Sequence, residues 1–218
     1  MFIINCKNYE EVASNDKIIK LVRTVEKISK KYKIKVAIAP PQHMIGLAVK
    51  NSSIPILAQH VDDSRVGSTT GFIVPELLKK IKVKGSLINH SEHRITSKEI
   101  SQLVAKLRKL HMISVVCVKD VSEVKKYAKL NPDYIAIEPP ELIGSGKAVS
   151  KERPELITKA VYSVRSSDAK LLCGAGIVSG EDVAKASDLG AKGILVASGI
   201  IKAKNWSKII DEFSKAML

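Results

Sequence analysis

The sequence predicts an α/β fold, a single (β/α)8 barrel domain that spans residues 1–218. Eight short runs rich in β-branched residues alternate with longer segments whose apolar residues recur at helical spacing. Strands that alternate with helices form a parallel sheet, because each helix returns the chain to start the next strand alongside. Dividing 218 residues among eight units leaves about 27 residues each, close to the minimum for one strand and one helix.

The eight runs are predicted as strands because each is short, mostly apolar and bounded by polar residues or glycine. They are Phe2–Asn5, Lys35–Ala39, Pro55–Gln59, Ser86–Asn89, Ser114–Val118, Tyr134–Glu138, Lys170–Cys173 and Gly193–Ala197. An open, doubly wound sheet is the alternative arrangement of the same elements. No Gly-x-Gly-x-x-Gly follows the first run, which weakens a dinucleotide-binding version of that alternative.

The segments between the runs are predicted as amphipathic helices, and those near the end cover Gly180–Leu189 and Asn205–Met217. Three serines precede such segments as expected N-caps: Ser14, Ser97 and Ser179. Two connections are longer than a minimal turn, His60–Gly71 and Pro139–Val149. Loops of that length in a compact domain are usually functional or disordered.

The chain carries 36 Lys and Arg against 22 Asp and Glu, a formal net charge of +14. Nucleic-acid binding is one interpretation, but 30 of the basic residues are Lys and only 6 are Arg. Arg is the residue favoured for bidentate phosphate and base recognition. With 3 Phe, 5 Tyr and 1 Trp there is little to stack on bases. We therefore favour solvated Lys-rich helix faces and no nucleic-acid partner, with a charge that attracts small anionic substrates.

The amino-acid composition and the pattern of apolar residues predict a soluble, cytoplasmic protein without a membrane partner. No stretch approaches the roughly 18 apolar residues of a membrane span. A polar residue after four positions argues against a signal peptide, and three cysteines without a Cys-x-x-Cys argue against a disulfide framework.

In a barrel, chemistry is carried by the carboxyl-terminal ends of the strands and the loops beyond them. The last two strands are followed by Gly174-Ala175-Gly176 and by Ala197-Ser198-Gly199, where backbone N–H groups can converge on an anion. Tight turns alone would also explain such glycines. The two segments together indicate a phosphate site.

His90 follows the apolar run Leu87-Ile88 and begins a short segment that ends at Arg94. A single histidine is more often a packed or surface residue than a catalyst. At a helix N-terminus the positive end of the dipole disfavours the protonated imidazole, and a neutral imidazole can donate a hydrogen bond to a carbonyl. A metal site of His90 with His93 is a weaker hypothesis, because no other ligand stands at a recognised spacing.

Glu138 ends an otherwise apolar strand and is followed by Pro139-Pro140. Apolar neighbours raise the proton affinity of a carboxylate toward the range that a general base needs. A helix cap or a salt bridge at the strand end is an equal alternative on strand context alone.

With these residues collected, the chain resembles triosephosphate isomerase, a TIM barrel, in its short archaeal form. The resemblance is carried by Asn5-Cys6-Lys7, by the segment from Asn89 to Arg94, by the segment from Glu138 to Gly146, by Cys173-Gly174-Ala175-Gly176, and by Ala197-Ser198. Five motifs in order, at the spacing of barrel units, make the resemblance specific over the whole chain.

The resemblance implies an intramolecular aldose–ketose isomerase that interconverts dihydroxyacetone phosphate and D-glyceraldehyde 3-phosphate through an enediolate, in glycolysis and gluconeogenesis. It implies that Glu138 is the base, His90 the neutral electrophile and Lys7 a cation beside the enediolate and phosphate. It implies no cofactor and no metal. The substrate-binding residues that it implies are Asn5, Lys7, Ile143, Gly144, Gly176, Ala197 and Ser198.

The sequence also departs from the family's pattern. Glu141-Leu142 replaces the aromatic residue usual in the sixth loop, and Gly176 stands where many members have a serine. In the family the third loop, here residues 60–71, inserts into a second subunit beside the Asn-x-Lys segment. The resemblance therefore implies self-association into a dimer or tetramer, with Thr70 packed near Asn5 and Lys7 of the other copy. A mobile solvent loop is the alternative.

Other phosphate-binding barrels fit less well. A ribulose-phosphate epimerase requires His and Asp metal ligands on several strands, which the sequence lacks. A phosphoribosyl isomerase usually pairs acids after strands one and five, where this chain has Asn5 and Cys117. A catalytically inactive phosphate binder and a basic nucleic-acid-binding protein stay open as alternatives from other classes, although Glu138, His90 and Lys7 argue for an active enzyme.

Overall fold

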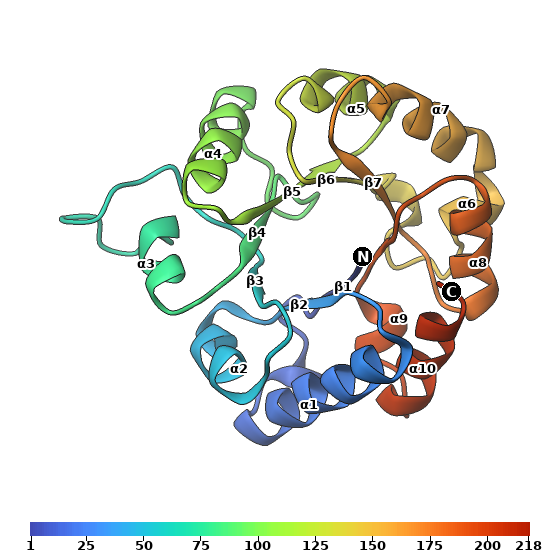
Figure 1. Ribbon diagram of the computed structural model, residues 1–218, viewed down its shortest axis with the longest axis horizontal. Coiled ribbons are helices and arrows are strands. Elements are labelled where there is room, and N and C mark those ends of the chain that lie inside the picture. Colours follow the sequence, from blue (N-terminus) through green and yellow to red (C-terminus); the bar gives the residue numbers. More distant parts are fainter.

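In the computed structural model, which describes residues 1–218, eight parallel strands curl into a barrel surrounded by helices (Figure 1). The strands are β1 (Phe2–Asn5), β2 (Val36–Ala39), β3 (Leu57–Ala58), β4 (Gly85–Ile88), β5 (Ile113–Val118), β6 (Tyr134–Ile137), β7 (Lys170–Gly174) and β8 (Ile194–Val196). Neighbours follow chain order and β1 pairs with β8, so the sheet curls round on itself. The predicted barrel is confirmed, and the open doubly wound alternative is wrong.

Helices cover the outside of the barrel, most of them between consecutive strands (Figure 1). They are α1 (Asn15–Tyr32), α2 (Ile45–Asn51), α3 (Pro75–Lys80), α4 (Ser97–Lys109), α5 (Val121–Ala128), α6 (Val149–Glu152), α7 (Pro154–Val164), α8 (Gly180–Asp188), α9 (Ser198–Ile201) and α10 (Trp206–Lys215). Three 3₁₀ turns accompany them, η1 (Glu10–Val12), η2 (Gln42–Met44) and η3 (Pro140–Leu142). None of these helices is long and apolar enough to cross a lipid bilayer.

The barrel closes between β2 and β3 through a single parallel bridge, Ile38 with Ile56. The strand predicted over residues 55–59 shortens to two residues, Leu57–Ala58. Proline has no N–H to donate to a neighbouring strand, so pairing cannot continue from the N–H of Pro55. Its carbonyl still accepts a hydrogen bond from Ile38 N at 3.1 Å.

Alternate residues of each strand enter two apolar layers. Inside the barrel, ten buried residues fill the axis, and their members come from all eight strands: Ile3, Ala37, Ala39, Leu57, Leu87, Val115, Cys117, Ala136, Leu172 and Leu195. Their sequence neighbours, such as Ile4 and Ile38, point outward into a layer of 52 buried residues shared with the helices. This period of two is the geometry of a strand that is buried on both faces.

Helix starts follow the predicted N-caps in two of three cases. Ser179 caps α8 with its hydroxyl, and Ser14 occupies the cap position of α1 without a side-chain hydrogen bond. The prediction for Ser97 is wrong, because Thr96 caps α4. Thr96 and Glu99 bond reciprocally to each other's backbone N–H groups, a capping box that satisfies two otherwise unpaired donors.

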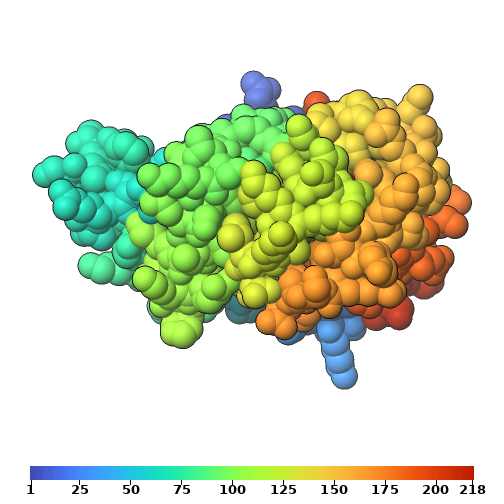
Figure 2. All heavy atoms as spheres, turned by 90° about the horizontal axis from the view of Figure 1, so that it is seen from above, coloured from blue at the N-terminus to red at the C-terminus, as the bar shows by residue number.

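The connection between β3 and α3 stands out from the barrel as its largest projection (Figures 1 and 2). It contains the predicted long loop, residues 60–71, whose tip is exposed. Asp62 anchors its base, since the Asp62 carboxylate accepts a hydrogen bond from Ile73 N at 2.6 Å and Asp62 N donates to the carbonyl of Ile73.

Candidate active site

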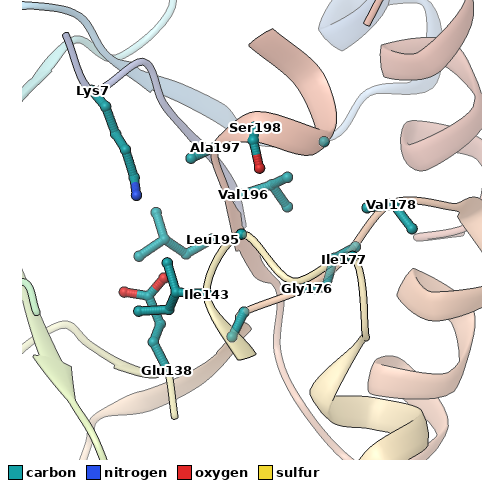
Figure 3. A pocket seen from close by; sticks show the side chains of 14 residues that line it. Lys7, Glu138, Ile143, Gly176, Ile177, Val178, Leu195, Val196, Ala197 and Ser198 are labelled. Atoms are coloured by element: carbon teal, nitrogen blue, oxygen red, sulfur yellow. The ribbon is translucent and has the colours of Figure 1, made fainter. Parts of the chain in front are cut away.

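One pocket opens where β1, β6, β7 and β8 end (Figure 3). Lys7 follows β1, Glu138 follows β6 and Gly176 follows β7, while Ser198 begins α9 beyond β8. The side chains of Lys7 and Glu138 reach toward each other from opposite sides of this pocket (Figure 3). The pocket therefore brings together a cation, a carboxylate and glycine-rich backbone.

Lys7 is held both by its backbone and by packing of its side chain, which is only 12% exposed. Its φ is 46°, in the left-handed region, and its N–H donates to Asn5 Oδ1 at 3.0 Å. From the other side, Gln59 Nε2 donates to the Lys7 carbonyl at 2.8 Å. The ammonium donates to Glu92 Oε1 at 2.6 Å, an ion pair in which the carboxylate is largely exposed.

The Glu138 carboxylate is buried, with 7% of the residue exposed, and its Oε2 has no hydrogen-bond partner. Burial raises the pKa of Glu138, although His90 and Lys7 nearby oppose that rise. An unpaired buried carboxylate oxygen costs free energy, so this arrangement is not explained by stability. Of the two alternatives left open by the sequence, the carboxylate caps no helix, and the basic side chain within 4 Å of it is that of His90.

Gly174 forms the surface against which Glu138 lies. A Cβ at position 174 would come within 2.6 Å of Glu138 Cγ, closer than carbon atoms approach without displacement. The absence of a side chain at the end of β7 therefore sets where the carboxylate of the neighbouring strand lies.

His90 is buried beside Glu138, and its Nε2 lies 3.6 Å from Glu138 Oε2. Its Nδ1 accepts a hydrogen bond from Glu92 N at 3.2 Å. A nitrogen that accepts a hydrogen bond carries no proton, so this contact leaves the N–H of the ring on Nε2. This tautomer turns an N–H donor toward the carboxylate.

Asn89 fixes the segment that bears His90. Its φ of 63° turns the chain sharply after β4. Its amide Nδ2 donates to the Cys117 carbonyl at 3.0 Å, and its Oδ1 accepts from Ile95 N at 3.2 Å. Arg94 adds a hydrogen bond to the Asn89 carbonyl at 3.3 Å. The turn is thereby tied to β5 on one side and to its own far end on the other.

The opposite wall of the pocket is backbone. Gly176 has a φ of 71°, and a Cβ there would fall 1.8 Å from the Lys147 carbonyl oxygen, so no other residue fits this approach. Ala197 precedes α9 and Ser198 begins it, and the first N–H groups of a helix have no acceptor within the helix. Donors without partners therefore line the side of the pocket that faces away from Glu138.

His93 turns away from this pocket and stacks on His60, with ring centroids 3.9 Å apart. His60 Nε2 in turn lies 3.2 Å from Asp62 Oδ1. Nowhere in the chain do three or more His, Cys, Asp or Glu side chains form a group that could hold a metal ion. The hypothesis of a metal held by His90 and His93 therefore lacks its further ligands.

Comparison with known proteins decides the family. A family model described as triosephosphate isomerase matches residues 1–213. The triosephosphate isomerase of Cenarchaeum symbiosum is 55% identical over 218 residues, covering 100% of this chain and 97% of the relative. The chain belongs to the triosephosphate isomerase family. Enzymes of that name from Methanothermus fervidus and Saccharolobus solfataricus are 43% and 44% identical, each over 100% of this chain and 98% and 96% of their own.

As a triosephosphate isomerase family member, the chain is an isomerase, and most of its predicted site residues share the pocket. Seven of them line it: Lys7, Glu138, Ile143, Gly144, Gly176, Ala197 and Ser198. The other two, Asn5 and His90, are buried behind the lining, where Asn5 contacts Lys7 and His90 faces Glu138. Their individual roles in this chain stay predictions.

An ion pair lies in the segment after Glu138. This is the segment in which Glu141-Leu142 replaces the expected aromatic residue. Glu141 lies in η3, and its Oε1 is 2.6 Å from an Arg153 nitrogen at the junction of α6 and α7. Both side chains are about half exposed, so the pair contributes little to stability. It spans the loop from its first turn to the helix that follows it.

Three residues support the site through contacts that the sequence did not predict: Gln59, Asn89 and Gly174. Gln59 and Asn89 are the last residues of predicted strands, where a polar side chain signals a place beside the site. Gly174 offers no such signal, because its contact with Glu138 depends on the register of β6 with β7.

Replacing Gly174 with alanine should displace the Glu138 carboxylate and lower isomerase kcat by about 100-fold, since misplacing a catalytic group by about 1 Å has that effect. Steady-state assays measure the loss, and a crystal structure of the variant measures the displacement. Gly46→Ala is the matched control, because a Cβ at position 46 has no neighbour within 4 Å. Equal activity of both variants would contradict the assigned contact.

Proposed function

We propose that this chain interconverts dihydroxyacetone phosphate and D-glyceraldehyde 3-phosphate, with Glu138 as base and neutral His90 as electrophile, and without a cofactor. The observation that carries the proposal is the unpartnered, buried Oε2 of Glu138 facing the Nε2 of His90, beside a pocket whose other wall is glycine-rich backbone. The relatives' printed name, triosephosphate isomerase, supports the same substrate.

Glu138 removes the proton from the carbon next to the carbonyl. Burial raises the pKa of its carboxyl group, which makes the carboxylate a stronger base than one in water. The free Oε2 accepts the proton without first breaking a hydrogen bond to the protein. The same carboxyl returns the proton to the neighbouring carbon, so the reaction needs one base.

His90 polarises the carbonyl and moves protons between the two oxygens of the enediolate. Its Nε2–H is available because Glu92 N holds Nδ1 as an acceptor. A neutral imidazole is a weak acid, so it donates a strong hydrogen bond to an oxygen that develops negative charge. The 3.6 Å between Nε2 and Glu138 Oε2 supports this proposal, because base and donor at that spacing can act on adjoining atoms of one substrate.

Lys7 supplies the positive charge, and the backbone wall holds the phosphate. In the proposed complex, substrate oxygens compete with Glu92 for the Lys7 ammonium. Gly144, Gly176 and Ser198 surround the phosphate with N–H groups, with Ala197 at the start of the same turn and Ile143 closing the apolar side. Asn5 acts by holding Lys7 in its left-handed conformation. We place the reaction in glycolysis and gluconeogenesis, in the cytoplasm.

The proposed function is tested with purified protein in a coupled assay of D-glyceraldehyde 3-phosphate with chelator present. Turnover should persist, and Glu138→Gln should lower kcat by at least about 100-fold, the lower range for a positioned general base. His90→Gln should also lower kcat while binding of phosphoglycolate is retained. A folded protein without turnover, or Glu138→Gln with nearly full activity, would overturn the proposal.

The raised pKa of Glu138 has a signed effect on stability. A carboxyl whose folded pKa is raised stabilises the fold below its unfolded pKa of about 4.3 and loses that contribution as pH rises through the folded value. Glu138→Gln should therefore be more stable than the parent at neutral pH, and this gain should vanish near pH 4. Urea unfolding at several pH values measures it, and a gain that is independent of pH would contradict the burial argument.

We further propose that residues 60–71 dock onto a second copy of this chain. Exposed apolar side chains gather on this loop and the helix after it, with Val66 52% and Phe72 56% exposed and Leu77 and Ile81 each 46%. Apolar surface gathered on a projection favours a protein partner. The exchange of loops between two copies makes a closed, isologous dimer in which Thr70 packs near Asn5 and Lys7 of the other copy.

Light scattering at micromolar concentration should show a dimer or a tetramer. Thr70→Glu should reduce both assembly and activity, because it buries a charge at the proposed contact. Tyr162→Glu adds a charge at an exposed position of α7 and serves as control. A fully active monomer would rule out this assembly.

A further inference from the structure

Two hollows adjoin at the amino-terminal end of the barrel, opposite the candidate active site. The larger, of about 640 Å³, and the smaller, of about 330 Å³, share Met1, Lys35 and Lys192 in their linings. In Figure 2 the light-blue segment leading into β2 and the orange segment leading into β7 lie at the edge opposite the yellow segment that follows β6. The hollows are therefore separate from the pocket that holds Glu138.

Four cationic side chains line these hollows: Lys35, Arg165, Lys170 and Lys192. No Asp or Glu is in either lining, and none of the four cations takes part in an ion pair. Asp133, which precedes the lining residue Tyr134, turns its Oδ2 to the backbone and hydroxyl of Ser114 instead. The charge of the hollow is thus not neutralised from within the chain.

The strand order brings three of the lysines together. Lys35 directly precedes β2, Lys170 begins β7, and Lys192 lies two residues before β8. Backbone hydrogen bonds fix these starts to the strands beside them: Phe2 N to the Lys35 carbonyl at 2.9 Å, and Lys192 N to the Leu171 carbonyl at 2.8 Å. In the strand order β2-β1-β8-β7, the strands that carry Lys35 and Lys170 are three neighbour-to-neighbour steps apart. At the usual spacing between paired strands, this is about 14 Å along the rim of the barrel.

Like charges gathered along one rim repel one another, although their exposure to solvent screens the repulsion. In barrels of this type the amino-terminal end carries stability rather than chemistry, so repulsion there has no catalytic purpose. A ligand of opposite charge relieves it. A chain of several phosphates matches a rim of about 14 Å better than a single phosphate group does, and Arg165 lines the same hollow.

We propose that the amino-terminal end of the barrel binds a small oligophosphate, with Lys35, Lys170, Lys192 and Arg165 as its ligands. The hollow is concave and roomy enough to enclose several phosphate groups. Tyr134, which pairs with Lys170 across β6 and β7, adds an aromatic surface at one end. The inference does not depend on the proposed function, because none of these residues belongs to the candidate active site.

Isothermal titration with sodium tripolyphosphate tests the site, with saturating phosphoglycolate present to occupy the candidate active site. One tripolyphosphate should bind per chain, and Lys170→Gln/Lys192→Gln should weaken binding about tenfold, because two ion pairs are lost. The matched control is Lys27→Gln/Lys98→Gln, which removes the same charge from exposed positions outside both hollows. That control should leave the affinity within about twofold of the parent.

Isomerase turnover of Lys170→Gln/Lys192→Gln should equal that of the parent, which separates this site from the catalytic one. Three results would overturn the inference. The first is no binding of tripolyphosphate, and the second is an equal loss in both double variants, which would indicate only diffuse net charge. The third is a duplex DNA that binds more tightly than tripolyphosphate and loses affinity in Lys170→Gln/Lys192→Gln, because the surface would then be a nucleic-acid face rather than an oligophosphate site.

Discussion

The parallel register of eight short strands is the constraint on which the candidate site depends. Glu138 and Gly174 meet only because β6 and β7 pair from Tyr134 with Lys170 to Ile137 with Cys173. A shift of one residue would turn every alternate side chain from the barrel axis to the helix layer. The ten residues that fill the axis therefore hold the register, and the register brings the polar strand ends to one mouth.

Left-handed backbone recurs at that mouth. Lys7 after β1, Asn89 after β4 and Ala175 after β7 all have positive φ, although none is glycine. Such a conformation costs about 1 kcal/mol or more per residue and persists only where surrounding contacts enforce it. Asn5 and Gln59 enforce it at Lys7, and the Asn89 amide enforces it at its own turn. The strand ends are thus rigid because hydrogen bonds compensate for strain.

The pattern of apolar residues predicted the positions of all eight strands. A strand that is buried on both faces appears in the sequence as a short apolar run bounded by turn residues. It overestimated β3, since the loss of pairing around Pro55 depends on a neighbouring strand that the local pattern does not contain. Ser97 was mistaken for a cap because both Thr96 and Ser97 carry a hydroxyl, and only the reciprocal bond with Glu99 separates them. The polar residues at strand ends could be predicted from the order of residues along the chain. The contact of Gly174 with Glu138 could not, because it depends on how two strands pair.

Because the Lys147 carbonyl lies so close to Gly176, the segments around these two residues cannot change independently in evolution. Any side chain at position 176 would overlap that oxygen, so a substitution there is viable only after the backbone around Lys147 has moved. Any mutational path to another residue at position 176 therefore requires the backbone change around Lys147 first, which makes the two positions epistatic.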